Sequence, residues 1–408
     1  MKRLITIFAT LLVMVGCTSF GDGDPYAEAL QTLRIKAVYP EGYETFTRSG
    51  VRITAEDIQT QNHYTALTDE RGEVLFRIPR GHYRLSMSDR AAKDARFNGV
   101  LESVRLQDEE LTYSMPLIYL KTSSIIFKEL YFGGCPKTPT EGTLLNDQYI
   151  ILHNNDSEVQ YLDGICFGSV DPYTSASQMN GWVTMGDDGN LIFQDFAPIN
   201  EVVWQFQGSG TDFPLQPGED AVVSLKGAVD FTKEFPLSVN LNKKGYFACH
   251  SRLHYSNESQ HIAPGDQIEE DHILKVLKKT GKANAFVIAM QSPAVVIFRP
   301  EAGFDLKGYL ADDSRSVATV PGGTNKCVKA PWDWVLDGVE VFYSINNNKR
   351  IPPAVDAAAI LFSAHSMGYS IERHVDEEES QQAGYEVLVD TNSSATDFYE
   401  RKTSSLHE

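Results

Sequence analysis

The sequence YTALTDERGEVLFRIPRGHY, residues 64–83, predicts the fold of the first part of the chain. Val74, Phe76 and Ile78 recur at every second position, which is the period of a strand that buries one face. Gly72 and the Pro-Arg-Gly sequence after Ile78 are turn signals, so the strand between them is short. The stretch therefore predicts short, half-buried strands separated by tight turns.

The same alternation continues on both sides of this stretch. Apolar residues alternate with polar ones over residues 33–37, 51–54 and 83–87, and turn signals such as residues 40–42 separate the runs. Many short strands with regular turns are typical of a β-sandwich. We therefore predict a sandwich over residues 31–120.

One motif in this region is more specific than the alternation. It consists of Thr-Asp, Gly, Phe and Pro-x-Gly-x-Tyr in order, and its members are Thr68, Asp69, Gly72, Phe76, Pro79, Gly81 and Tyr83. This order resembles the carboxypeptidase-regulatory, transthyretin-like sandwich. In bacteria such modules usually serve as spacers or docking units, so the resemblance implies an N-terminal unit without catalytic activity.

The remainder of the chain, residues 121–408, is predicted to form a second and larger β unit. Residues 125–131 end in I-x-x-E-L-Y, residues 149–154 have the sequence YIILHN, and an L-x-G motif follows. This order resembles the lamin-tail sandwich, with Glu129 at the place of its first acid and Ile151 where its second motif usually has Glu. The predicted fold class is mainly β: a transthyretin-like or Ig-like sandwich, then an elaborated lamin-tail-like sandwich, with little helix.

Helix is expected in one place, residues 271–279. Asp271 can cap this segment, three apolar residues share one helical face, and a glycine follows. Residues 375–383 are expected to form an exposed acidic loop. Lys349 and Arg350 are expected to be solvated surface cations.

Taken whole, residues 31–408 resemble an uncharacterised family of surface lipoproteins from gut-type bacteria. That resemblance implies architecture and location but no activity, since the family has none assigned. Relatives often lie beside outer-membrane receptors, which implies an accessory role in uptake. The residues that carry the resemblance are Gln148-Tyr149-Ile150, Tyr161-Leu162-Asp163-Gly164, residues 334–340, Lys349-Arg350-Ile351-Pro352, residues 390–394 and Asp397-Phe398.

The N-terminus has the pattern of a lipoprotein signal. Lys2 and Arg3 precede an apolar run over residues 4–15, which is too short to cross a bilayer comfortably. Gly-Cys at the end of the run resembles the bacterial lipobox, in which the cysteine is acylated after cleavage. We therefore expect residues 1–16 to be removed, Cys17 to carry lipid, and residues 17–30 to form the tether of an outward-facing outer-membrane lipoprotein.

The charge balance excludes one class of function. The chain has a formal net charge of -19, which becomes two charges more negative when Lys2 and Arg3 are removed. Proteins that grip nucleic acid through phosphates need a basic face, and no basic patch stands out here. We therefore expect no nucleic-acid partner, and no cofactor motif is recognised either.

Four cysteines remain after Cys17, and an even number in an exported protein permits two disulfides. Cys135 with Cys166 is the preferred pair, because both flank strands of one predicted unit. Free buried thiols are the alternative. There is no C-x-x-C motif, so neither a zinc knuckle nor a thioredoxin-like site is indicated.

Candidate binding residues are few. His250, His254 and His261 fall within a short stretch and suggest a weak metal site, although surface histidines are the simpler interpretation. Trp332 and Trp334 lie two apart, which would place them on one face of an extended strand as an aromatic surface for a sugar. Packing of the same rings is again the simpler alternative.

The leading hypothesis is a non-enzymatic lipoprotein that acts as a binding or accessory component of an uptake or adhesion assembly. Its partners would be the membrane, through the lipid, and an outer-membrane receptor. The first alternative is capture of a glycan or a metal. The second is a hydrolase that uses His365 and Ser366 with Asp356, but the nucleophile-elbow motif of such enzymes is missing from the sequence.

Overall fold

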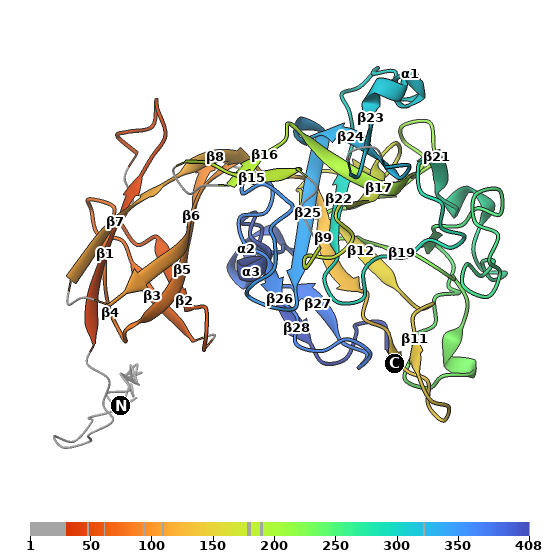
Figure 1. Cartoon of the computed structure of the whole chain (residues 1–408), viewed down its shortest axis with the longest axis horizontal. Coiled ribbons are helices and arrows are strands. Elements are labelled where there is room, and N and C mark those ends of the chain that lie inside the picture. The colour runs from red at the N-terminus through yellow and green to blue at the C-terminus, as the bar shows by residue number, and fades with distance from the viewer. Residues whose placement is uncertain are drawn as a thin grey trace, which may run out of the picture.

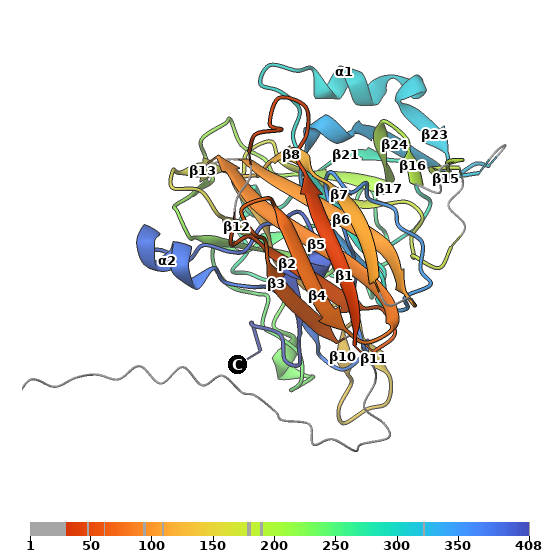
Figure 2. The same cartoon turned by 90° about the vertical axis from the view of Figure 1, so that its left-hand side faces the viewer.

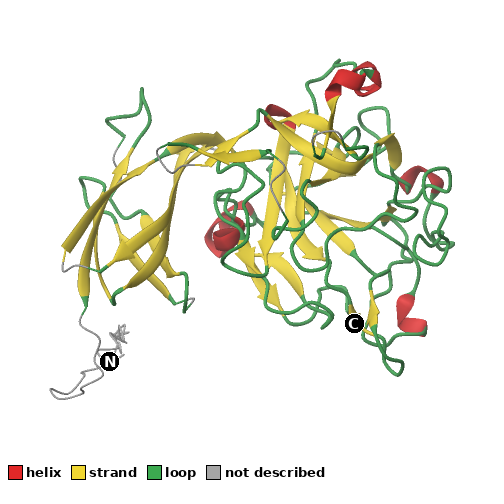
Figure 3. Cartoon of the chain, in the orientation of Figure 1, coloured by secondary structure: helices red, strands yellow, loops and turns green. Residues whose placement is uncertain are grey.

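A computed structural model describes residues 30–407, apart from 47–48, 61, 93–94, 108–109, 178–180, 188–190 and 321–322. The predicted signal peptide and Cys17 lie outside the described residues. Strands dominate and helices are few and short, so the predicted mainly-β class is confirmed (Figure 3). Strands β1 to β8 form one body, and the later elements form a larger second body beside it (Figure 1).

The N-terminal body is a sandwich of two sheets that lie one over the other (Figure 2). One sheet has the order β4-β1-β7 and the other the order β3-β2-β5-β6-β8. Its core contains the alternating apolar residues of the sequence, among them Leu33, Val74 and Phe76. The strands are β1 (Gln31–Val38), β2 (Arg52–Asp57), β3 (His63–Leu67), β4 (Glu73–Ile78), β5 (Gly81–Ala92), β6 (Ala95–Leu106), β7 (Glu110–Pro116) and β8 (Ile118–Lys121).

The motif of this body has a direct structural explanation. The Tyr83 hydroxyl donates a 2.8 Å hydrogen bond back to the Pro79 carbonyl, which fixes the turn between β4 and β5. A Cβ at Gly81 would lie 2.7 Å from Oδ2 of Asp57 and 2.9 Å from the Tyr83 ring. Only glycine therefore fits at this position without displacing both side chains.

The C-terminal body packs a six-stranded sheet, in the order β20-β19-β12-β9-β27-β28, against an eight-stranded one. The core between them includes Leu130, Ile150, Phe167 and the fully buried Trp204. The six-stranded sheet contains β9 (Ile125–Tyr131), β12 (Tyr149–Asn154), β19 (Asp220–Ser224), β20 (Phe247–Ala248), β27 (Ser370–Arg373) and β28 (Phe398–Arg401).

The eight-stranded sheet follows the order β23-β24-β17-β14-β22-β25-β26, with β21 paired to β17. Its strands are β14 (Cys166–Val170), β17 (Phe196–Gln205), β21 (Lys275–Lys279), β22 (Ala294–Phe298), β23 (Ser316–Ala318), β24 (Lys326–Pro331), β25 (Val335–Phe342) and β26 (Ile360–Leu361). Short two-stranded ladders are formed by β10 (Cys135–Pro136) with β11 (Thr143–Leu144), β13 (Gln160–Tyr161) with β18 (Pro214–Leu215), and β15 (Val183–Met185) with β16 (Leu191–Phe193).

The helix predicted over residues 271–279 is wrong. The segment forms only a 3-10 turn, η2 (Glu270–His272), and then strand β21, which pairs antiparallel with β17. Pairing at the sheet supplies the backbone hydrogen bonds that a helix would otherwise have supplied, so the tertiary context overrides the local pattern. The other helical elements are η1 (Phe231–Lys233), η3 (Asp313–Arg315), η4 (Trp332–Trp334), α1 (Leu306–Ala311), α2 (Glu377–Ala383) and α3 (Ser394–Asp397).

The predicted acidic loop also differs, because α2 occupies most of residues 375–383. The Asp376 side chain caps this helix by accepting from the Glu379 N–H, and Gly384 ends it with φ 81°. Three glutamates in the first turn favour helix, since negative charge near an N-terminus is stabilised by the exposed N–H groups. The segment is acidic and largely exposed, as predicted, but it is a short helix.

Lys349 and Arg350 are not surface cations, and that prediction is wrong. Arg350 is 2% exposed, and its Nε donates a 2.9 Å hydrogen bond to Glu340, which is fully buried. Lys349 Nζ reaches the other oxygen of Glu340 at 3.0 Å. Burial opposes ionisation of Glu340, yet the two cations outweigh it and hold the pKa of Glu340 below its usual value.

A second buried ion cluster centres on Arg373 of β27. Its Nη2 donates to Asp337 at 2.8 Å, and its Nη1 donates to Asp390 at 3.1 Å and to Asp397 at 2.9 Å. Its Nε donates to the carbonyl of Phe127 in the neighbouring β9. Much of the family resemblance is therefore carried by residues that join strands inside the C-terminal body.

Candidate functional site

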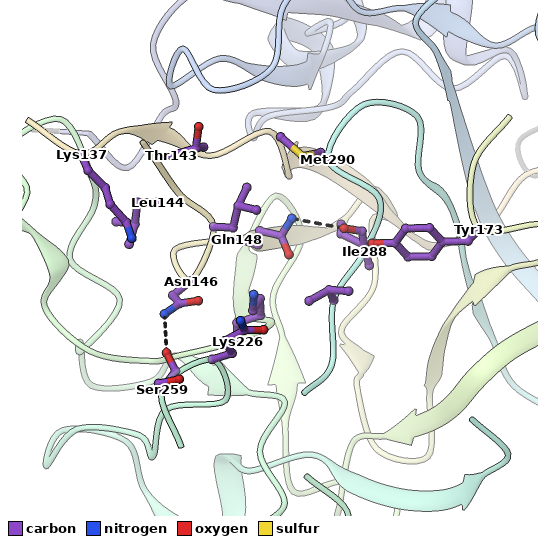
Figure 4. A pocket seen from close by; sticks show the side chains of 13 residues that line it. Lys137, Thr143, Leu144, Asn146, Gln148, Tyr173, Lys226, Ser259, Ile288 and Met290 are labelled. Carbon is purple, nitrogen blue, oxygen red and sulfur yellow. Dashed lines mark hydrogen bonds between the residues drawn. The ribbon is translucent and has the colours of Figure 1, made fainter. Parts of the chain in front are cut away.

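A cavity of about 470 Å³ opens in the C-terminal body beside the end of the β12–β19 pair (Figure 4). Lys226 and Gln148 lie on its wall, the first just after β19 and the second just before β12. The lining residues are Lys137, Thr143, Leu144, Leu145, Asn146, Gln148, Tyr173, Lys226, Ser259, Gln260, Val287, Ile288 and Met290. No carboxylate and no imidazole occur among them.

The strand pairing places Lys226 and Gln148 together. The Leu225 N–H donates to the Gln148 carbonyl at 2.9 Å, which extends the antiparallel ladder one step past its regular strands. The Lys226 carbonyl in turn accepts from the Ile262 N–H at 3.0 Å. Asn146 closes another side by donating to the Ser259 carbonyl at 3.1 Å.

Lys226 is the unusual residue of this cavity. The residue as a whole is 3% exposed, and within the described part of the chain its ammonium group has neither an ion pair nor a hydrogen-bond acceptor. The nitrogen is not among the fully buried side-chain atoms, so it reaches the open space of the cavity. Burial lowers the pKa of Lys226 to about 8, against the attraction of the nearby Asp147. At neutral pH the group is therefore still mostly charged, and the cavity holds a cation without a direct partner.

Asp147 does not neutralise Lys226 by contact. Its carboxylate accepts instead from Ser238 at 2.7 Å, from Tyr131 at 3.0 Å and from the Cys135 thiol at 3.4 Å. Burial raises the pKa of Asp147 to about 6. Asp147 therefore attracts the Lys226 ammonium group from a distance without bonding to it, and the ammonium group faces the cavity.

Gln148 adds a polar acceptor to the same wall. Its Nε2 donates to the carbonyls of Phe132 at 2.6 Å and Ile288 at 3.3 Å, which fixes the orientation of the amide. Its buried Oε1 has no hydrogen-bond partner among the described residues, and it points into the cavity in Figure 4. An unpaired buried acceptor costs free energy unless a donor reaches it.

The three predicted metal-binding histidines do not form a ligand set. His261 is fully buried, and its Nε2 accepts from the Ser251 N–H, so this nitrogen is not free for an ion. His250 stacks on it with ring centroids 5.0 Å apart, while His254 bonds the Ser251 hydroxyl instead. Burial lowers the pKa of His261 to about 4, which is the signature of a packed neutral ring.

Two other groups of described side chains have metal-ligand geometry, but neither forms a convincing site. His153, Asp220 and Glu386 lie together, yet Lys128 already binds both carboxylates. The second group, around His272, consists mostly of exposed acids on the η2 turn.

The predicted tryptophan face takes a different form. Trp332 and Trp334 lie on η4 and not on an extended strand. Trp332 Nε1 donates to the Gln194 carbonyl, whereas the Trp334 ring packs edge-on against Phe304 and Tyr309 at 4.9 Å each. The two rings therefore have different partners, and the Trp334 ring is part of a packed aromatic cluster.

The predicted disulfide between Cys135 and Cys166 is wrong. The four cysteines of the described residues are buried free thiols, which was the alternative. Cys135 packs in the cluster outside the six-stranded sheet, and Cys166 belongs to the cluster outside the eight-stranded sheet. Burial raises the pKa of both thiols to about 12.

The hydrolase residues are not brought together either. His365 bonds only its neighbour Ser366 among the described residues, at 2.8 Å. Asp356 is buried elsewhere, where it accepts from the N–H and hydroxyl of Ser394 and from the Glu340 N–H. The geometry therefore provides no carboxylate to orient His365.

Part of the C-terminal body is similar to a known protein family. Residues 216–405 match the family model described as protein of unknown function DUF4876. Lys226 and both buried ion clusters centred on Glu340 and Arg373 lie within the matched segment.

One solved structure extends the likeness to most of the chain. A DUF4876 family protein from Bacteroides thetaiotaomicron matches with a TM-score of 0.58 and 24% identity, covering 90% of this chain and 94% of that one. A Streptococcal ancillary pilin matches with a TM-score of 0.18 and 13% identity, over 46% of this chain and 57% of that one. No protein of curated description matches the chain.

Of the two cavity residues discussed above, Lys226 and Gln148, the sequence pointed to one. Gln148 is among the residues that carry the family resemblance, but nothing singles out Lys226. The one sequence feature that could have drawn attention to Lys226 is its position directly after the apolar run of β19. A charged residue at such a position can either extend into solvent beyond the strand end or be buried beside it. Only the packing of residues 259–262 and 287–290 over the strand end decides between these outcomes.

Proposed function

We propose that this protein is a non-enzymatic, lipid-anchored protein of the outer membrane that faces outward and captures a small ligand for an uptake or adhesion assembly. The single observation that carries the proposal is the unpartnered ammonium group of Lys226 in a cavity of ligand size. Such concave sites with a few fixed polar groups are the usual form of small-molecule binding sites. The residue is largely buried and its ammonium group opens only into the cavity, where an anionic ligand would gain by reaching it, so a binding role explains its presence.

Binding accounts for the cavity better than catalysis does. The lining side chains include neither a carboxylate nor a histidine that could accept a proton next to a hydroxyl nucleophile. Lys226, with a pKa of about 8, is mostly protonated at neutral pH, so its main form offers a positive charge to a ligand. The role proposed for it is to hold a ligand.

The acyl group expected on Cys17 would supply the attachment. Among the described residues, none of the helices is long and apolar enough to cross a membrane. The acidic chain would be repelled from an anionic lipid surface, so the body would stand off the membrane on its tether. The cavity would then face the medium or a receptor.

Cross-linking in native membranes tests the proposed location and partner. Wild-type protein is expected to sediment with outer membranes and to cross-link to an integral outer-membrane protein. A Cys17→Ser variant is expected to move to the soluble fraction and to lose the cross-link. Retention of this variant in the membrane, or recovery of the wild type without any integral partner, would count against the proposal.

A further inference from the structure

We infer that the ligand of the Lys226 cavity is a small organic anion that also carries a hydroxyl or amide N–H group. This inference rests on the proposed function, because it names the chemical class that the proposed ligand site would take. It depends on three features of the cavity wall: the Lys226 ammonium group, the Gln148 acceptor and the lack of carboxylates.

The charge of the ligand follows from Lys226. The chain as a whole is strongly acidic, yet the cavity is lined by two lysines and by no acid. A buried cation is stabilised when an anion enters and forms a charge-assisted hydrogen bond with it. A cationic ligand would meet the opposite situation, since no lining side chain could balance its charge.

The donor on the ligand follows from Gln148. Both N–H groups of its amide are held by backbone carbonyls, so Oε1 is the atom left to face the cavity. Only a donor can satisfy that oxygen. An ammonium donor is disfavoured by the lack of a carboxylate, which leaves a hydroxyl or an amide N–H.

The other lining residues determine the size and polarity of the ligand that the cavity can accept. Leu144, Val287, Ile288 and Met290 give the cavity an apolar side, and Asn146 contributes a further polar group. A volume of about 470 Å³ accommodates a ring the size of a monosaccharide with room to spare. A sugar acid combines an anion, several hydroxyl groups and an apolar ring face, so it represents the inferred class well.

Calorimetric titration with three six-membered-ring probes tests both halves of the inference. Glucuronate has the charge and the hydroxyl groups, glucose has only the hydroxyl groups, and cyclohexanecarboxylate has only the charge. The full chain is expected to bind glucuronate at least about tenfold more tightly than either comparator, a difference of about 1.4 kcal/mol. Lys226→Met is expected to abolish the preference for glucuronate over glucose, whereas Lys226→Arg and the exposed-site control Lys233→Met are expected to keep it.

The pH dependence provides a second readout. Three neighbouring groups keep their protonation state between pH 7 and 9. The Asp147 carboxylate has a pKa of about 6 and stays ionised, and His261 has a pKa of about 4 and stays neutral. Tyr173 has a pKa of about 12 and keeps its proton. Lys226, with a pKa of about 8, loses its charge over this range. Affinity for glucuronate is therefore expected to fall as pH rises through about 8 in the wild type, and to fall much less in Lys226→Arg.

The outcomes separate this inference from the proposed function. Equal affinity for glucose and glucuronate would overturn the anionic class and leave ligand capture standing. Equal affinity for cyclohexanecarboxylate and glucuronate would overturn the requirement for a donor. Heat from none of the three probes would overturn the inference and also remove the main support for the proposed capture role.

Discussion

Arg373→Met is expected to lower the free energy of unfolding by about 3–5 kcal/mol, or to prevent the C-terminal body from folding. Arg373 is 2% exposed and holds three carboxylates, those of Asp337, Asp390 and Asp397, at 2.8–3.1 Å. Burial would lower its pKa, but the surrounding carboxylates outweigh that effect and raise it. Removing the guanidinium group leaves these acids buried together without a cation.

The effect should appear in urea unfolding followed by fluorescence. Arg315→Met is the matched control, because Arg315 pairs with Asp312 at 3.6 Å at an exposed site. Surface pairs of this kind contribute little, so the control should change stability by no more than about 1 kcal/mol. Equal losses for the two variants would mean that the buried cluster does not hold the strands together.

Glu340→Gln is expected to destabilise the protein by about 3 kcal/mol or more, because it removes the carboxylate that two buried cations share. The substitution keeps the shape of the side chain but removes the charge that Lys349 and Arg350 share. The remaining donors of Arg350 reach the carbonyls of Ser292 and Pro172 at 3.0 and 3.1 Å, which do not balance its charge. The guanidinium group would then lose its direct carboxylate partner and keep only the longer-range attraction of Asp171.

The control for this substitution is Glu258→Gln. Glu258 forms an ion pair with Arg252 at a well-exposed site, so its loss is expected to cost less than about 1 kcal/mol. Chemical unfolding of both variants measures the difference. A Glu340→Gln protein as stable as the wild type would contradict the assignment of Glu340 as the charge that compensates Lys349 and Arg350.

The N-terminal sandwich was predictable because its strands have one buried and one exposed face. Alternation along β1 and β4 shows in the residue types themselves, and the turn between β4 and β5 needs glycine at position 81 for steric reasons. Strands β9 and β12 also lie where the lamin-tail-like motifs of residues 125–131 and 149–154 predicted them. Local sequence was sufficient wherever the period or the turn chemistry was strong.

The errors occur where distant segments decide the outcome. Residues 275–279 have a helical pattern, but β17 offers them a strand partner. Lys349 and Arg350 look like surface cations until Glu340 is folded against them. Trp332 and Trp334 have strand spacing, yet they form a tight turn beside α1. Charged and aromatic residues of this kind carry no local signal of the partner that buries them.

The residues of the cavity could not be predicted from the sequence for the same reason. Lys226 and Gln148 are distant in sequence, and the loops that bury them come from two further segments of the chain. Their juxtaposition follows from the register of β12 with β19, which a single sequence does not reveal. The three histidines, which were predicted from short spacing, are held by packing and by bonds to Ser251 instead of forming a ligand set.

The central claim is that Lys226 is kept for binding and that the ion clusters are kept for folding. Urea unfolding of Lys226→Met tests it most directly, because the variant replaces a cation that has no protein partner among the described residues with an apolar side chain of similar length. Removal of a partly desolvated charge that makes no ion pair should not weaken the fold, so the account predicts a free energy of unfolding equal to or greater than that of the wild type. A loss of stability comparable to that of Arg373→Met would contradict the account and would make Lys226 a structural residue.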